Sequence, residues 1–395
     1  MRIDTKSHIA KRMQGIHSEA AFEVFARASA LERQGRSIVH LEIGEPDFDT
    51  PEAVVKSAIG WLRKGATHYS PTQGVPELRE AIAARLSWRH KVQVDAQNIH
   101  MSPGTKMMIF ACIQAVVDPG DEVISVDPGY PAYEAAVRMA GGVPVMVPAE
   151  ESNQFRFTVD DLKRRITKRT KLIIINSPQN PTGGVLTLKD LMGVAELALE
   201  HDLLILSDEI YGKIFYDQRP PSMLDVPGIL DRLMLVNGYS KAWAMTGWRL
   251  GFGLLPPEVF PAVDLFLNTS VSATATFTQR AALDAAFLPE TEAAIDKMVA
   301  EFKKRRDVFV DGLNNIPGIR CLRPSGAFYL FPNISALGKS SREIADRLLT
   351  EGGVAGLPGT AFGRNGEGFM RFSFANSLSN IETALERIRT FVSTL

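Results

Sequence analysis

The chain has 395 residues, 45% of them hydrophobic, and a formal net charge of -1. A chain of this length can bury a large core and suggests two domains, because single cores stop growing near roughly 250–300 residues. The balanced charge, with no basic run and no strong excess of either sign, excludes the usual electrostatic signature of a nucleic-acid-binding protein.

The cysteines and the N-terminal residues indicate the cellular compartment in which the protein is expected. Cys112 and Cys321 lie far apart with no Cys-x-x-Cys spacing, so neither a zinc site nor a disulfide framework is expected, and a reducing cytoplasm fits. Residues 1–10 mix charged side chains without an apolar core, unlike a signal peptide. No apolar run approaches the roughly twenty residues that span a bilayer. We therefore expect a soluble cytoplasmic protein with no bound metal and no membrane partner.

The first elements are a helix and a short strand. Residues 18–35 predict a helix that has Phe22 and Phe25 near one face. A short strand over 38–43 follows, and then a turn-rich loop over 44–51. A polar loop between two regular elements is either a connector or part of the mouth of a site, and its position alone does not decide between them.

From residue 51 onward, helices alternate with apolar, strand-like runs. Helices are predicted to begin at Pro76 and after Pro103, and another spans 187–201. The strand candidates are Val123–Val126, Val143–Val147, Leu172–Ile175, Leu203–Leu206, Leu233–Val236 and Leu250–Leu254. Several of these runs are continuous rather than alternating, which indicates strands buried on both faces of a largely parallel sheet. The expected class is α/β, with helices on both faces of that sheet.

After about residue 285 the pattern changes. A long, charged helical region leads to a strand over 326–331, a helix over 341–351, a strand over 369–374 and a terminal helix over 379–393. This pattern is typical of a smaller α+β domain, which the N-terminal strand would join. The predicted domains are therefore a large one over 49–285 and a small one made of 1–48 and 286–395.

Lys241 is the first candidate for chemistry. It follows the apolar run Leu233–Val236 and has Ala242, Trp243 and Met245 beside it. Burial disfavours the charged form of a lysine, and a neutral amine can attack a carbonyl to form a Schiff base. Arg249, eight residues later, suits a phosphate that it can grip through two N–H groups. Taken alone, these residues are better explained by a solvated lysine and an arginine that lies along an apolar surface.

Polar residues follow two other predicted strands. Asn180 lies among turn-forming residues after Leu172–Ile175, and its amide could donate to a ring oxygen, although Asn-Pro-Thr-Gly alone is an ordinary turn. Asp208 follows Leu203–Leu206, where a buried carboxylate needs a cation such as a protonated pyridine nitrogen. Capping of a following helix is the alternative. Tyr211 could reach the same ring.

Three further segments carry candidates. Gly104, Thr105 and Lys106 stand at the start of a helix, where free N–H groups and the helix dipole favour phosphate. Tyr130 could stack on a planar ring. Arg371 lies inside an apolar strand pattern and needs an anionic partner, which is either a substrate carboxylate or a structural carboxylate.

Together these segments resemble the class I/II aminotransferases, pyridoxal-phosphate enzymes of the aspartate aminotransferase fold, along nearly the whole chain. The motifs that carry the resemblance are Tyr69-x-Pro71-x-x-Gly74, Gly104-Thr105-Lys106, Asn180-Pro181-Thr182-Gly183, Asp208-Glu209-x-Tyr211, Ser240-Lys241 with Gly247-x-Arg249-x-Gly251, and Arg371-Phe372-Ser373. The resemblance implies a mostly parallel seven-stranded sheet between helices, with a smaller α+β domain. It also implies transfer of the amino group of an L-amino acid to a 2-oxoacid in ping-pong half-reactions.

The resemblance also implies a role for each matching position. Lys241 would hold pyridoxal 5'-phosphate as an internal aldimine and move the proton at Cα, while Asp208 would pair with the pyridinium nitrogen. Ring contacts would come from Asn180, Tyr211 and Tyr130, and phosphate contacts from Gly104, Thr105, Lys106 and Arg249. Ser240 would also contact the cofactor, and Arg371, Asn180 and the backbone near Gly44 would contact the substrate. Tyr69 would reach the phosphate of the other subunit, which implies a homodimer with shared active sites.

One position departs from the family pattern, and alternatives to transamination remain. Gly238 stands where the family often has a phosphate-binding serine, so either cofactor affinity is lower or another group compensates. The same machinery serves carbon–sulfur lyases and aminocyclopropane-carboxylate synthases. A pyridoxal-phosphate-binding regulator would need a DNA-binding module, and a dinucleotide-dependent dehydrogenase would need Gly-x-Gly-x-x-Gly after a strand, which is absent from the sequence. Substrate preference is not readable, because it would be set by the loop at 44–48, the surroundings of Tyr130 and residues of a partner subunit. Lys106 could attract an acidic substrate, but its place beside the expected phosphate site favours a structural role.

Overall fold

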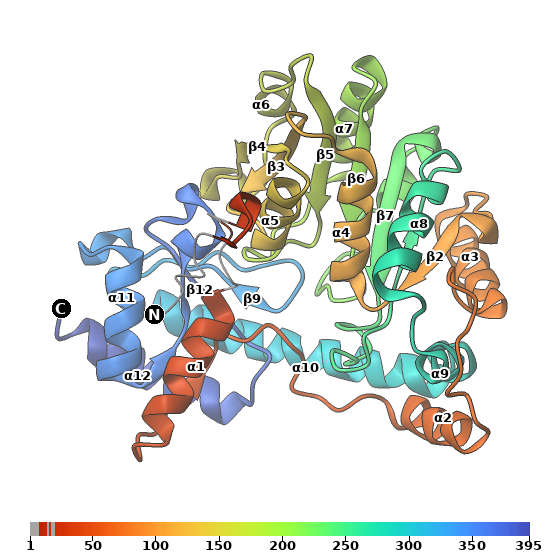
Figure 1. The fold of residues 1–395 in the computed structure, drawn as a ribbon. Coiled ribbons are helices and arrows are strands. Elements are labelled where there is room, and N and C mark those ends of the chain that lie inside the picture. Colours follow the sequence, from red (N-terminus) through yellow and green to blue (C-terminus); the bar gives the residue numbers. More distant parts are fainter. Residues whose placement is uncertain (1–7, 14–15, 17–19) are drawn as a thin grey trace, which may run out of the picture.

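The computed structural model describes residues 8–13, 16 and 20–395, and a seven-stranded sheet lies at its centre (Figure 1). The strands lie in the order β2 (Ile99–Ser102), β8 (Gly251–Leu254), β7 (Leu233–Gly238), β6 (Leu204–Asp208), β5 (Thr170–Asn176), β3 (Glu122–Asp127) and β4 (Val143–Pro148). Neighbouring strands from β7 to β4 are parallel, whereas β8 runs antiparallel to β7 and to β2. The mostly parallel sheet predicted from the apolar runs is confirmed.

Side chains of the central strands alternate between two apolar layers. In β5, Leu172 and Ile174 pack into the layer that contains helices α4 (Thr105–Val116), α5 (Pro131–Met139) and α8 (Phe260–Val271). Ile173 and Ile175 pack into the opposite layer, with α3 (Pro76–His90), α7 (Leu188–Glu200), α9 (Thr276–Ala285) and α10 (Pro289–Asn314). Because successive residues of a strand point to opposite faces, a continuous apolar run satisfies both layers.

Two short sheets lie outside the central sheet. One sheet contains β11 (Leu357–Pro358), β12 (Met370–Ser373) and β9 (Tyr329–Leu330), and the other pairs β1 (Val39–His40) with β10 (Val354–Ala355). The remaining helices are α1 (Ala20–Glu32), α2 (Glu52–Arg63), α6 (Val159–Lys163), α11 (Ser341–Arg347) and α12 (Leu378–Val392). The pairing of β1 with β10 joins the N-terminal segment to the C-terminal part of the chain. Among the described residues, no helix combines the length and the apolar character that a membrane span requires.

Two features were not predicted from the sequence. The strand β2 was not predicted, because His100 and Ser102 interrupt its apolar pattern; both are buried, and His100 Nε2 lies 2.9 Å from Asp264 Oδ1. The first helix is present as α1, but the side that carries Phe22 and Phe25 does not face the core: Phe22 is 62% exposed and Phe25 is also exposed, whereas Ala28 is buried. The expected start of that helix at 18–19 lies outside the described residues.

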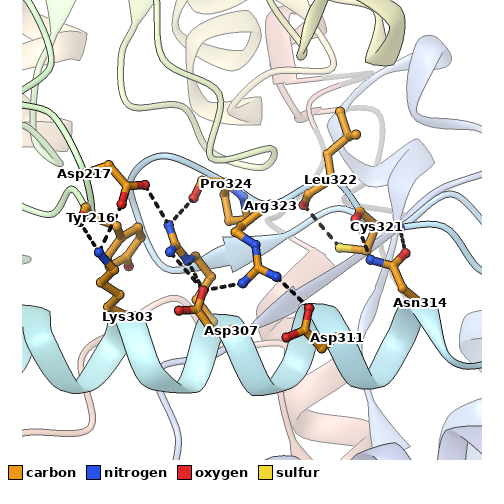
Figure 2. Close-up of polar contacts among 11 residues, drawn as sticks. Tyr216, Asp217, Lys303, Asp307, Asp311, Asn314, Cys321, Leu322, Arg323 and Pro324 are labelled. Atoms are coloured by element: carbon orange, nitrogen blue, oxygen red, sulfur yellow. Dashed lines mark hydrogen bonds and ion pairs between the residues drawn. The ribbon is translucent and has the colours of Figure 1, made fainter.

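Polar contacts along α10 hold two distant segments on one helix (Figure 2). Lys303 Nζ donates to the Tyr216 carbonyl oxygen at 2.9 Å, and Arg306 Nη1 donates to the Pro324 carbonyl oxygen at 3.0 Å. Arg323 reaches back to two aspartates of the helix, Asp307 and Asp311. Arg306 is only 2% exposed, so its hydrogen bonds are made in a buried setting, where they matter most. Figure 1 shows α10 lying across the lower side of the molecule, from α9 toward α11 and α12.

Candidate active site

A cavity of about 540 Å³ opens at the carboxyl ends of the parallel strands. This is the edge at which ligands bind in open α/β sheets, because the loops that follow the strands converge there. The cavity is lined by eleven of the residues predicted from the sequence: Gly44, Thr105, Lys106, Tyr130, Asn180, Asp208, Tyr211, Ser240, Lys241, Arg249 and Arg371. The structure therefore brings most of the predicted residues together.

Lys241 lies in the turn that follows β7. Its Nζ donates a hydrogen bond to the Gly44 carbonyl oxygen and lies 5.8 Å from the centroid of the Phe328 ring. The neighbouring Ser240 is buried. The amine is thus held inside the cavity by a backbone oxygen from a segment about 200 residues away in the chain.

Asp208 is a buried carboxylate at the end of β6. Tyr133 Oη donates to its Oδ2 at 2.7 Å, and the Ile210 N–H donates to its Oδ1 at 3.1 Å. Burial nevertheless dominates and raises the pKa of Asp208 to about 6, while these two hydrogen bonds and the charge of Lys241 act in the opposite direction. A cation placed against this carboxylate would relieve the cost of its burial.

A second cluster lies on the side of the cavity that β12 and β9 form. Arg371 is buried in β12; its Nη1 donates to Asn180 Oδ1 at 3.2 Å and its Nη2 donates to the Glu42 carbonyl oxygen. Its guanidinium lies 4.5 Å from the centroid of the Tyr329 ring. The hydroxyl groups of Tyr211 and Tyr329 lie 2.8 Å apart. Because Arg371 fixes the amide oxygen of Asn180, the donor side of that amide remains for another ligand.

A third group of residues leaves room for an oxyanion at the start of α4. Gly104 has φ +89°, and a Cβ there would lie 2.3 Å from Arg249 Nη2, so only glycine allows this approach. Arg249 Nη1 donates to the Thr246 carbonyl oxygen at 2.9 Å. A Cβ at Gly238 would lie 2.5 Å from Thr105 Oγ1, which means that the Thr105 hydroxyl takes the space a serine would need.

Two predicted residues do not line the cavity. Gly104 lies behind Arg249, as described above, and Tyr69 is 89% exposed in the segment between α2 and α3. The loop around Tyr69 is anchored to the start of α9, since Thr276 Oγ1 donates to the His68 carbonyl oxygen at 2.6 Å and Gln279 Nε2 donates to Ser70 Oγ at 3.0 Å. The phenol of Tyr69 is thus presented outward from an anchored loop.

Sequence reasoning missed three residues that shape the site. Tyr133 holds Asp208, Tyr329 holds Tyr211, and Asn176 Nδ2 donates to the Asp208 carbonyl oxygen at 2.9 Å. Asn176 carried a signal, because it ends the strand candidate that precedes Asn180. Tyr133 and Tyr329 carried none, since only the tertiary fold brings them to their partners.

Comparison with known proteins decides the family. The sequence profile of the family described as "Aminotransferase class I and II" matches residues 36–388. The chain belongs to this family. The aspartate aminotransferase of Pyrococcus abyssi is 41% identical over 355 residues, which cover 89% of this chain and 91% of the relative. The aromatic-amino-acid aminotransferase 2 of Thermococcus litoralis is 39% identical over 382 residues, which cover 96% of this chain and 97% of the relative.

A solved structure agrees with this assignment. The aspartate aminotransferase of Thermus thermophilus, solved with maleate, superimposes with a TM-score of 0.93 at 38% identity and covers 97% of this chain and 99% of that one. The chain is therefore an aminotransferase with the fold of the aspartate aminotransferases. The lyase and synthase alternatives are not favoured, because the similar proteins are named as aminotransferases.

Proposed function

We propose that this aminotransferase binds pyridoxal 5'-phosphate in the 540 Å³ cavity and transfers the amino group of a dicarboxylic L-amino acid to a 2-oxoacid. The observation that carries the cofactor assignment is the buried Asp208, whose raised pKa of about 6 reflects a carboxylate that lacks a strong cationic partner. When bound, the cofactor supplies a carbonyl group for the amine and a pyridinium ring that withdraws electrons from Cα. Asp208 would hold the proton on that ring nitrogen.

The remaining residues divide among binding, orientation and proton transfer. Lys241 would anchor the cofactor through Nζ and carry the proton between Cα and the cofactor carbon, since its amine lies inside the cavity. Asn180 and Tyr211 would donate to the ring hydroxyl, and Tyr130 would cover the ring face. Arg371 suits the substrate α-carboxylate, because a guanidinium binds a carboxylate through two parallel N–H groups.

We assign the phosphate site to the N-terminus of α4. The backbone N–H groups of Gly104, Thr105 and Lys106 would bind the phosphate together with Ser240 and Arg249, as expected at a helix N-terminus. The room that Gly104 leaves for the Arg249 guanidinium supports this assignment. The Thr105 hydroxyl fills the space that a serine at position 238 would need, but it donates to the Asn237 carbonyl oxygen at 3.1 Å, so the backbone N–H of Thr105 would be its phosphate donor.

Lys106 supports an acidic substrate. It lines the cavity, and its ammonium group lies 5.8 Å from the centroid of the Tyr130 ring. Since Arg371 and Arg249 are assigned to the α-carboxylate and the phosphate, Lys106 is the cation best placed for a side-chain carboxylate. The Pyrococcus abyssi relative is named an aspartate aminotransferase, and maleate in the Thermus structure is a dicarboxylate.

An aromatic substrate is the second candidate. Phe22, Phe25, Leu357 and Phe362 also line the cavity, so apolar surface faces the same space as Lys106. The Thermococcus litoralis relative carries an aromatic-amino-acid name. The two candidates differ in what the lysine contributes, because a carboxylate needs its charge and an aromatic ring does not.

We further propose a cytoplasmic homodimer with shared active sites. The outward position of Tyr69 on an anchored loop supports a contact with the cavity of a second subunit. Cys112 and Cys321 are both free and buried, which supports a reducing compartment. The large domain over 49–285 and the small domain made of 1–48 and 286–395 remain our proposed division of the chain.

Visible absorption of the purified protein tests the cofactor and the reaction together. A yellow band that bleaches when a single amino acid is added supports cofactor binding and the first half-reaction, whereas no band after addition of pyridoxal phosphate overturns the proposal. Lys241→Ala should abolish turnover while the far-ultraviolet circular dichroism stays unchanged. Substantial remaining turnover would refute the role of Lys241.

Lys106→Met tests the substrate class. The variant keeps the length of the side chain and removes its charge. We expect kcat/KM for aspartate to fall about tenfold to a hundredfold, because a hydrogen bond to a charged group contributes about 1.5–3 kcal/mol, and kcat/KM for phenylalanine to change little. Equal losses for both substrates would point to a structural role beside the phosphate.

A further inference from the structure

A second cavity of about 80 Å³ lies on the other side of the segment that carries Asp208. It is bounded by α3, by the segments that follow β6 and β7, and by Phe287. Its apolar wall is largely aromatic, with Tyr239, Trp243, Phe252 and Phe287. None of the residues assigned above to the cofactor or the substrate lines it.

Basic side chains crowd the polar side of this cavity. Arg85, Arg89, His90, Lys213 and Arg219 line it, and the acidic residue in the lining is Glu209. Burial of its carboxyl group raises the pKa of Glu209 to about 7, and its Oε1 already accepts from two serine hydroxyls and from the Met223 N–H. Near neutral pH this carboxyl group is therefore only partly ionised, and its Oε1 is already engaged by these donors.

The carboxylates next to the cavity are shared among the other cations. Glu292 pairs with both Arg85 and Lys213. Asp225 pairs with Arg219 and with His90, at 2.9 and 2.8 Å. Within the part of the chain that the structure describes, neither an ion pair nor a hydrogen bond connects Arg89 to a partner.

Arg89 is therefore a half-buried cation that faces like charges. It lies one helical turn beyond Arg85 on the same face of α3. Burial lowers the pKa of Arg89, and the charges of Arg219 and Arg85 lower it further, while Glu209 and Glu292 act in the opposite direction without reversing the shift. A guanidinium in such a setting gains most from an anion that accepts two of its N–H groups.

Tyr239 provides an independent sign of a polar ligand. Its side chain is 1% exposed and lines the cavity, yet its hydroxyl has no hydrogen-bond partner among the described residues. A buried hydroxyl without a partner costs about 1–3 kcal/mol. A ligand oxygen in the cavity could accept from this hydroxyl and from Arg89.

We propose that this cavity binds a compact oxyanion, either a small carboxylate or inorganic phosphate, at a site separate from the active site. The volume of about 80 Å³ limits the ligand to a few heavy atoms, because a cavity of about 150 Å³ is needed for benzene. Arg89 supplies the charge, and Tyr239 supplies a directed hydrogen bond. Ile210 lines both cavities, so the two sites share part of a wall.

Calorimetric titration of the holoenzyme with sodium phosphate and, separately, with sodium acetate tests the proposal. Sodium chloride at equal ionic strength corrects for general salt effects. Binding of either anion supports the site, and the anion that binds more tightly identifies the ligand as phosphate or carboxylate. The absence of saturable binding for both anions would overturn the proposal.

Two variants and a matched control locate the binding. Arg89→Met should weaken the affinity at least tenfold, while Arg63→Met should leave it unchanged, since Arg63 also lies in the last turn of a helix but is exposed and does not line the cavity. Anion bound in the active site would survive in Arg89→Met, so retained affinity in that variant refutes the assignment.

Tyr239→Phe removes only the hydroxyl. We expect a threefold to tenfold loss of affinity, with a melting temperature in the absence of the anion that is equal to or higher than that of the wild type. An unchanged affinity would show that the Tyr239 hydroxyl does not contact the anion. The proposal depends on this contact and would then be refuted.

Discussion

Asp208→Asn should stabilise the cofactor-free protein at neutral pH although it should impair transamination. The pKa of Asp208 is raised from 3.8 to about 6, mainly by burial, a difference of about two units. Each unit corresponds to about 1.36 kcal/mol, so the ionised carboxylate lowers the free energy of unfolding by about 3 kcal/mol. Asparagine cannot ionise and avoids this cost.

The sign of the pH dependence follows from the direction of the shift. The folded state holds the Asp208 proton more tightly than the unfolded state does. The stability that this protonated carboxyl group contributes is therefore fully present below pH 3.8 and is lost as the pH rises toward about 6. Above that pH the full cost applies. The substitution also replaces one acceptor oxygen by an NH₂ group, which disturbs the contact with Tyr133 or with the Ile210 N–H and costs about 1 kcal/mol.

Urea unfolding of the two apoproteins at equal protein concentration measures the difference. At about pH 8 the variant should be more stable by about 2 kcal/mol, and at about pH 4 it should be no more stable than the wild type. Pyridoxal phosphate should then stabilise the wild type more than the variant. A variant that is less stable at the higher pH, or a difference that does not change with pH, would show that burial of the Asp208 charge is not the dominant effect.

Two further substitutions test other parts of the structure. Gly238→Ser should lower the free energy of unfolding by about 1–3 kcal/mol, because the new side chain overpacks against Thr105. The substitution should not tighten cofactor binding. A higher affinity for pyridoxal phosphate in a spectroscopic titration would contradict this expectation. Arg306→Met should lower the free energy of unfolding by about 2–3 kcal/mol, because it leaves the buried Pro324 carbonyl oxygen without its charged donor. As a control, Lys304→Met on the exposed side of α10 should lower it by less than about 0.5 kcal/mol. Equal effects of the two substitutions in urea unfolding would show that the contacts in Figure 2 contribute little.

The sequence was most informative where local pattern and position decide the structure. Continuous apolar runs such as Leu172–Ile175 predicted buried parallel strands, and polar residues directly after those runs predicted the cavity, because parallel strands end at one edge. The prediction failed for β2, whose His100 is buried against Asp264, a partner 164 residues away. No local pattern encodes such a pairing.

The first helix was predicted, but the exposure of its phenylalanines was not. The spacing of Phe22 and Phe25 is typical of a core-facing side, yet both residues lie at the rim of the active-site cavity and are exposed. Periodicity identifies an apolar face without stating what covers it. The second cavity could not be predicted either, since Arg89, Lys213 and Tyr239 come from three separate segments whose convergence depends on the complete fold.

The contacts of Arg371 have a consequence for the synthesis of the chain. Its guanidinium binds the Glu42 carbonyl oxygen, 329 residues earlier, and Asn180, 191 residues earlier. A chain that leaves the ribosome from its N-terminus therefore exposes an unfinished cavity until almost all of it has been translated. Products that end before Arg371 would therefore lack its contacts with Glu42 and Asn180, so this side of the cavity is completed only near the end of synthesis.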